Sequence, residues 1–199
     1  MSRIWALWFP LGVVLLGFLA ACVSTDPVTT ARIATLSPIE ADPASFRVLL
    51  NVPEPLEIAR GGANLTLTWN SSRTPTKAQK AARLTIAEAA TATGGLSQTP
   101  GPGEKLVLMT VASDDVPALR GMQQEIRNAK ARGDEGHGSL SVSLSGGCWR
   151  GALSSAALPL SLRIWLQTAP NQSFLPVVRQ ADLRSLLGDD GMQALGQCP

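Results

Sequence analysis

Side chains suited to acid–base or nucleophilic chemistry are few in this chain. Its single histidine, His137, lies between glycines in the segment GDEGHG, residues 133–138. A Ser-His-Asp site would need this imidazole, because a nucleophilic hydroxyl requires a general base within hydrogen-bond reach. No G-x-S-x-G or S-x-x-K motif supplies a matching serine. We interpret His137 as a solvated turn residue and predict no catalytic residue.

Carboxylates raise two further chemical hypotheses. Asp134-Glu135-Gly136-His137 brings oxygen and nitrogen ligands together, but a metal site would need further ligands from elsewhere in the chain. The pairs Asp114-Asp115 and Asp189-Asp190 could transfer protons, yet each lies beside a predicted helix or turn, where aspartate commonly caps. We predict structural roles for both pairs, no metal site and no cofactor.

The chain begins with an apolar leader segment, residues 1–21. Arg3 precedes the uncharged run over residues 4–19, and polar, proline-bearing sequence follows Cys22. The run is shorter than the roughly 20 apolar residues that a membrane-spanning helix needs, and Pro10 interrupts it. A charged start, an apolar middle and small residues before a break predict a secretory signal peptide over residues 1–21.

The end of this leader, Leu19-Ala20-Ala21-Cys22, resembles the lipobox of bacterial lipoproteins. The resemblance implies that the Cys22 thiol receives a diacylglycerol, that the bond between Ala21 and Cys22 is cut, and that the new amino terminus is acylated, as with palmitate. Several acyl chains, at roughly 0.8 kcal/mol per buried CH₂, would anchor the protein to a membrane. In such lipoproteins a residue other than Asp after the cysteine, here Val23, favours the outer membrane, facing the periplasm.

The composition of the remaining chain narrows the class of protein. Removing the 21 leader residues from 199 leaves 178, enough for one domain and a tether. The leader carries one basic residue and no acidic one, so the formal net charge falls from +2 to +1. This near-neutral balance argues against a nucleic-acid partner. Cys148 and Cys198 remain, and an even pair in an oxidising compartment predicts a disulfide.

Periodicity divides the chain into a tether and a domain. Residues 22–43 contain three prolines and little periodicity, which predicts an extended, lipid-anchored tether whose Ile33, Leu36 and Ile39 could dock onto the domain or form a short first strand. Residues 44–199 are predicted as a single β-rich domain. Apolar–polar alternation predicts strands at about 46–52, 56–58, 64–70, 105–112, 139–145, 158–168 and 174–178. Residues 78–93 contain helix-favouring side chains, but alternation over 82–89 favours a strand.

Two helices are predicted. Leu119, Met122, Ile126 and Ala129 recur at helical spacing, with N-cap candidates at 113–115, Pro117 in the first turn and Gly133 at the end, which predicts a helix over 116–132. A short helix is expected over 183–187. The elements predict a mainly β antiparallel sandwich with one inserted helix and a short C-terminal helix. The alternative is an α+β arrangement in which helix 116–132 covers one antiparallel sheet.

Trp165 is the one candidate for a partner surface. It lies in the polar phase of its strand, opposite Leu162 and Ile164, and an outward tryptophan is typical of a binding hot spot. A second layer or the helix could equally cover it.

Three functions follow from these features. The first is a non-enzymatic interaction or assembly protein, attached to the membrane through its lipid and meeting an envelope protein partner. The alternative is a carrier or sensor that holds a small apolar ligand between its layers. The third, a hydrolase on an unrecognised template, would need His137 or an acidic pair inside a pocket.

Overall fold

A computed structural model describes residues 39–73, 77–88, 99–151, 160–184 and 192–199; the leader, the lipobox and most of the predicted tether lie outside this part. The main elements, in chain order, are η1 (Pro43–Ser45), β1 (Arg47–Pro53), β2 (Leu56–Ile58), β3 (Ala63–Asn70), β4 (Lys77–Glu88), β5 (Glu104–Val111), η2 (Ser113–Asp115), α2 (Val116–Ala131), β6 (His137–Leu144), β7 (Gly147–Trp149), β8 (Ser161–Gln167), β9 (Leu175–Asp182) and β10 (Gly196–Gln197).

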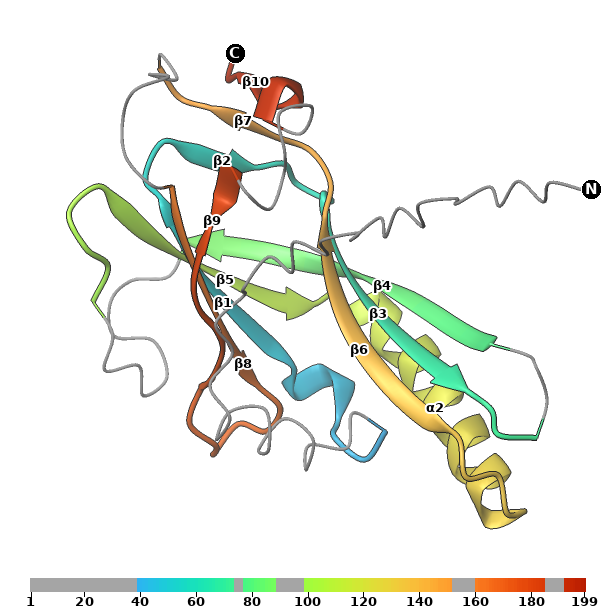
Figure 1. The fold of residues 1–199 in the computed structure, drawn as a ribbon. Coiled ribbons are helices and arrows are strands. Elements are labelled where there is room, and N and C mark those ends of the chain that lie inside the picture. Colours follow the sequence, from blue (N-terminus) through green and yellow to red (C-terminus); the bar gives the residue numbers. More distant parts are fainter. Residues whose placement is uncertain (1–38, 74–76, 89–98, 152–159, 185–191) are drawn as a thin grey trace, which may run out of the picture.

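The molecule is mainly β with one inserted helix, as predicted. Seven strands form a curled antiparallel sheet in the order β6-β3-β4-β5-β1-β8-β9, and β10, β7 and β2 form a second, small sheet. Helix α2 packs against one face of the large sheet, beside β3 and β4 (Figure 1). The layers therefore match the alternative arrangement, a helix covering one antiparallel sheet, more closely than two large sheets facing each other.

The main core lies between α2 and the large sheet. Alternate residues of the central strands face the helix, and the helical stripe predicted from the sequence covers them. Its fully buried members include Val48, Leu50, Leu65, Leu67, Met109 and Leu119. Burying each such side chain stabilises the fold by roughly 1.5–3 kcal/mol before the entropy cost of ordering the chain.

The ambiguous segment is a strand, as its alternation favoured, but it begins at Lys77 rather than near residue 82. Ala82 and Leu84 are buried on the core face while Arg83 and Thr85 are exposed. β4 pairs with β3 on one side and β5 on the other. These ladders outweigh the helical preference of its alanines and lysine, because propensity is a weak local term beside tertiary pairing.

Helix α2 ends within one residue of its prediction, but its expected side-chain cap is absent. Asp115 occupies the N-cap position without a capping bond to the helix. Its carboxylate instead accepts from the backbone N–H of Arg83 at 2.8 Å and from the guanidinium at 2.9 and 3.1 Å. These bonds from Arg83 lower the pKa of Asp115 to about 2. Asp115 thus ties the start of α2 to β4.

The end of the predicted tether docks on α2. Ile39 is buried, and its carbonyl accepts from Arg127 Nη1 at 3.1 Å. Gln123 Nε2 donates to the carbonyl of Ala41 at 2.8 Å. Asp42 pairs with Arg120 at 2.9 Å, and the hydrogen bond from Arg120 lowers the pKa of Asp42. Docking of Ile39 is thereby confirmed, whereas Ile33 and Leu36 lie outside the described residues.

The small sheet carries the cysteine pair. Cys148 of β7 and Cys198, which follows β10, lie at disulfide distance with their Cα atoms 4.9 Å apart, as the sequence predicts. Of the predicted C-terminal helix, residues 185–187 lie outside the described part, as do Asp189 and Asp190. No helix among the described residues is long and apolar enough to cross a membrane.

Candidate functional site

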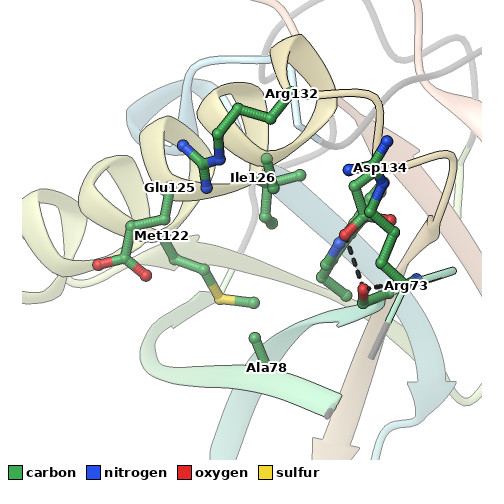
Figure 2. Close-up of a pocket in the computed structure, with 10 residues that line it drawn as sticks. Arg73, Ala78, Met122, Glu125, Ile126, Arg132 and Asp134 are labelled. Carbon is green, nitrogen blue, oxygen red and sulfur yellow. Dashed lines mark hydrogen bonds between the residues drawn. The ribbon is translucent and has the colours of Figure 1, made fainter. Parts of the chain in front are cut away.

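A pocket of about 400 Å³ opens between the second half of α2 and the neighbouring ends of β3 and β4 (Figure 2). This volume lies in the range of small-molecule sites. Its wall is made by residues of both layers: Trp69, Ser71, Arg73, Ala78, Met122, Glu125, Ile126, Ala129, Arg132 and Asp134.

The floor of the pocket is apolar. Trp69 shares the inward face of β3 with Leu65 and Leu67, because side chains alternate along a strand. Met122 and Ile126 lie one helical turn apart on α2 and meet the same face of the sheet. The floor is therefore a part of the hydrophobic core that the end of the helix leaves open.

Charged side chains surround this floor. Glu125 and Arg132 come from the helix side, and Arg73 rises opposite them (Figure 2). Arg73 Nε donates to the carbonyl of Gly133 at 3.0 Å, which joins the β3 end to the end of α2. Among the described residues, these three charged side chains form no ion pair with one another. The rim can therefore meet a polar or charged group on an incoming molecule.

Asp134 is a buried carboxylate with a structural role. Its oxygens accept from Ser71 Oγ at 2.7 Å, from the N–H and Oγ of Ser72 at 2.9 and 3.0 Å, and from the N–H of Gly136 at 2.9 Å. Led by the bond from Ser71, these donors hold the pKa of Asp134 far below its usual range. They stabilise the ionised form, so the carboxylate fixes the loop that follows α2 against the end of β3.

The described residues of the pocket wall do not bring a serine and a histidine together. Ser71 is the serine among them, and its hydroxyl donates to a carboxylate whose lowered pKa makes it a weak base. His137 is exposed at the start of β6 with Nε2 3.4 Å from Asn70 Nδ2, and it is not among the residues that line the pocket. Within the described ranges, no group of three or more His, Cys, Asp or Glu side chains could hold a metal ion.

One donor in the pocket wall lacks an acceptor. Trp69 is 4% exposed, and its indole Nε1 is buried without a hydrogen-bond partner. A Cβ built on Gly136 would lie 2.8 Å from Trp69 Cζ2, which is bonded to the same ring carbon as Nε1. That edge of the indole therefore faces the loop at 134–136. Leaving this donor buried without a partner costs about 1–3 kcal/mol of stability.

Trp165 is buried, contrary to its interpretation as an exposed partner surface. It is 4% exposed and clusters with Leu49 and Leu106, with Leu108 and Phe174 packed alongside. The register places Leu49 beside both Trp165 and Leu108. The side of the sheet away from α2 thus has its own apolar cluster. Consecutive apolar residues in β1 and β5 are the sequence signal for it.

The exposed apolar surface lies instead on β6, at one end of the large sheet. Within the described part of the chain β6 pairs with β3 alone, and the register places Leu140, Val142 and Leu144 on the core face, beside Leu67, Leu65 and Ala63. Yet Val142 is 38% and Leu144 42% exposed, and they are the two exposed large hydrophobic residues of the described part. The alternation of residues 139–145 predicted the strand, but it gave no sign that this strand is an edge.

Similarity to known proteins does not assign the site. The chain matches no family model, no curated protein and no solved structure.

Replacing Asp134 with Asn tests the role of this carboxylate. A folded-state pKa below the unfolded one, near 3.8, means that ionised Asp134 stabilises the fold above about pH 4, and that this contribution is lost as the pH falls towards the folded pKa. We expect Asp134→Asn to be less stable than the wild type near neutral pH, with the difference shrinking below about pH 4. Urea unfolding of the chain from residue 23 onward, followed by tryptophan fluorescence, measures this. The matched variant Glu135→Gln, at an exposed neighbour, should stay close to the wild type throughout.

Proposed function

We propose that this protein is a lipid-anchored protein of the bacterial envelope that acts by binding a protein partner along the free edge of β6. The observation that carries the proposal is the exposure of Val142 and Leu144 on an edge strand. An edge strand offers a row of backbone N–H and C=O groups to which another strand can pair. Here apolar side chains accompany those groups, so that pairing would also bury hydrophobic surface.

The proposed location in the bacterial envelope supports this function. The lipobox resemblance at Leu19-Ala20-Ala21-Cys22 favours export and lipidation, and Val23 favours the outer membrane, with the domain facing the periplasm. The pairing of Cys148 with Cys198 is typical of proteins that fold in an oxidising compartment. A tethered domain in that space meets other envelope proteins at high local concentration, because its anchor confines it to one surface.

Site-specific photo-cross-linking in intact cells tests the binding edge. A photoreactive residue replaces Ser141, which is exposed on β6, or Lys130, which is exposed on α2. We expect a discrete covalent adduct from position 141 and none from position 130. An equal pattern at the two positions, or no adduct at 141, contradicts a docking edge at β6.

The anchor has a separate test. Cys22→Ser removes the only sulfur that the lipobox places for acylation, so we expect complete loss of palmitate labelling and of leader cleavage before residue 22. Cys198→Ser, which keeps Cys22, serves as the control and should still be labelled. Labelling that survives in Cys22→Ser would refute the anchor.

The pocket favours a second candidate function, a carrier or sensor of a small apolar ligand. Its apolar floor and charged rim suit a mainly apolar molecule that carries one polar group. Ala129→Phe would fill the pocket from α2, whereas Ala118→Phe adds the same bulk at an exposed helical position. Mass spectrometry of molecules that co-purify with the protein should find a compound lost only in Ala129→Phe. Identical extracts from both variants would exclude the pocket as a ligand site.

A further inference from the structure

Most of β6, together with the residue that follows it, forms a palindrome. Residues 139–145 read SLSVSLS in both directions, with Val142 at the centre. Two antiparallel copies of such a segment present the same order of side chains to each other. This is the self-complementarity that a two-fold symmetric interface requires, because each residue must fit the residue that symmetry places opposite it.

The apolar residues of this segment also carry the outward backbone groups. The N–H of Ser145 donates to the carbonyl of Gly62, immediately beyond the Ala63–Leu144 pair. Along an antiparallel ladder, hydrogen-bonding residues alternate, so the odd-numbered residues of β6 bond to β3. The N–H and C=O groups of Leu140, Val142 and Leu144 consequently point away from β3, along the free edge.

Only one register matches every apolar residue. With the two-fold axis at Val142, that residue faces its own copy and Leu140 faces Leu144 of the second copy. An axis at Ser141 sets Leu144 opposite Gly138, and an axis at Ser143 sets Leu140 opposite Gly146. The register centred on Val142 therefore buries the most apolar surface, and it also sets Ser141 opposite Ser143, where hydroxyls can bond across the strands.

The two edges of the large sheet differ in protection. Edge strands are commonly guarded by proline, charged side chains or bulges. The opposite edge, β9, contains Pro176 and Arg179, and its pairing with β8 is interrupted by register shifts. Residues 139–145 of β6 contain no proline and no charged residue. Residues 139–145 themselves thus present a second copy with neither a proline nor like charges that repel.

We infer that the protein forms a symmetric homodimer in which β6 pairs antiparallel with β6 of a second copy, about a two-fold axis at Val142. The inference rests on the proposed function and names the partner at that edge. The two large sheets become one continuous sheet across the dimer. Val142 of each copy then lies beside its own counterpart and Leu144 beside Leu140, so that part of their exposed surface is buried.

Cysteine cross-linking of the full-length protein in its membrane tests this pairing. Directly opposite antiparallel residues have Cα atoms about 5.5 Å apart in hydrogen-bonded pairs, such as Val142 with its copy, and about 4.5 Å apart in the other pairs, such as Ser141 with Ser143. A disulfide can span both distances, whereas diagonal neighbours lie about 7–8 Å apart. Under mild oxidation we expect a covalent dimer from Val142→Cys and from the double variant Ser141→Cys/Ser143→Cys. Each single serine variant and Lys130→Cys should remain monomeric on non-reducing gels. Two differently tagged copies expressed together identify the dimer as a pair of this chain.

The alternative outcomes separate this inference from the function on which it rests. A dimer from Ser141→Cys or Ser143→Cys alone would move the axis by one residue and overturn the register. Absence of any homodimer, together with a photo-cross-link from position 141 to a different protein, would overturn self-pairing and leave the binding edge in place. Absence of both products would overturn the two proposals together.

Discussion

Loss of the Cys148–Cys198 bond is expected to lower the free energy of unfolding by about 4 kcal/mol, the chain-entropy estimate for its separation of 50 residues. The bond connects β7 to the end of the chain. β10 is only two residues long, and among the described residues it pairs with β7 alone. Without the cross-link, both the unfolded chain and the terminal strand gain conformational freedom.

The measurement compares the double variant Cys148→Ser/Cys198→Ser with the wild-type chain from residue 23 onward, by urea unfolding with and without a thiol reductant. Reductant should shift the wild type to the midpoint of the variant and leave the variant unchanged. Equal midpoints for the oxidised wild type and the double variant would show that the bond adds no stability.

Gly136→Ala is expected to cost about 3 kcal/mol, at the upper end for overpacking. A Cβ at this position would lie 2.2 Å from the carbonyl oxygen of Asn70, 2.8 Å from Trp69 Cζ2 and 2.9 Å from Ser71 Cα. Two of these neighbours are backbone atoms that cannot rotate away. The loop must move instead, and that movement weakens the hydrogen bond from the Gly136 N–H to Asp134.

Gly121→Ala provides the matched control. Gly121 is exposed on α2, and a Cβ there meets nothing within 4 Å. Alanine favours a helix over glycine by about 0.5–1 kcal/mol, so this variant should become more stable. The midpoint temperature of thermal unfolding should therefore fall in Gly136→Ala and rise in Gly121→Ala, relative to the wild type. A Gly136→Ala variant as stable as the wild type would contradict the close packing of the loop on Trp69.

The local pattern of apolar and polar residues was sufficient to predict most helices and strands of the fold. Alternation located β1, β3, β5 and β8, and helical spacing located α2, because each pattern records which face of its own element is apolar. The pairing of Cys148 with Cys198 was predicted because these are the two cysteines that remain besides Cys22. The start of β4 was missed because residues 77–81 lack apolar alternation, and pairing with β3 alone defines them.

The candidate site depended on information that alternation does not hold. Trp165 and Val142 both lie on well-predicted strands, yet one is buried on the supposed outer face and the other is exposed on the core face. What covers a side chain depends on strand order, and the pairing of β3 with β6 joins segments about 70 residues apart. The pocket likewise needs Trp69 and Met122 to meet across two layers, which no local window records.

The hydrogen bonds from α2 to the carbonyls of Ile39 and Ala41 limit how far the domain can lie from the membrane. If Cys22 carries the lipid, the 17 peptide units between Cys22 and Ile39 can span at most about 60 Å. The domain is then confined to a shallow layer of the periplasm beside its own membrane. Anything it recognises has to come within that layer.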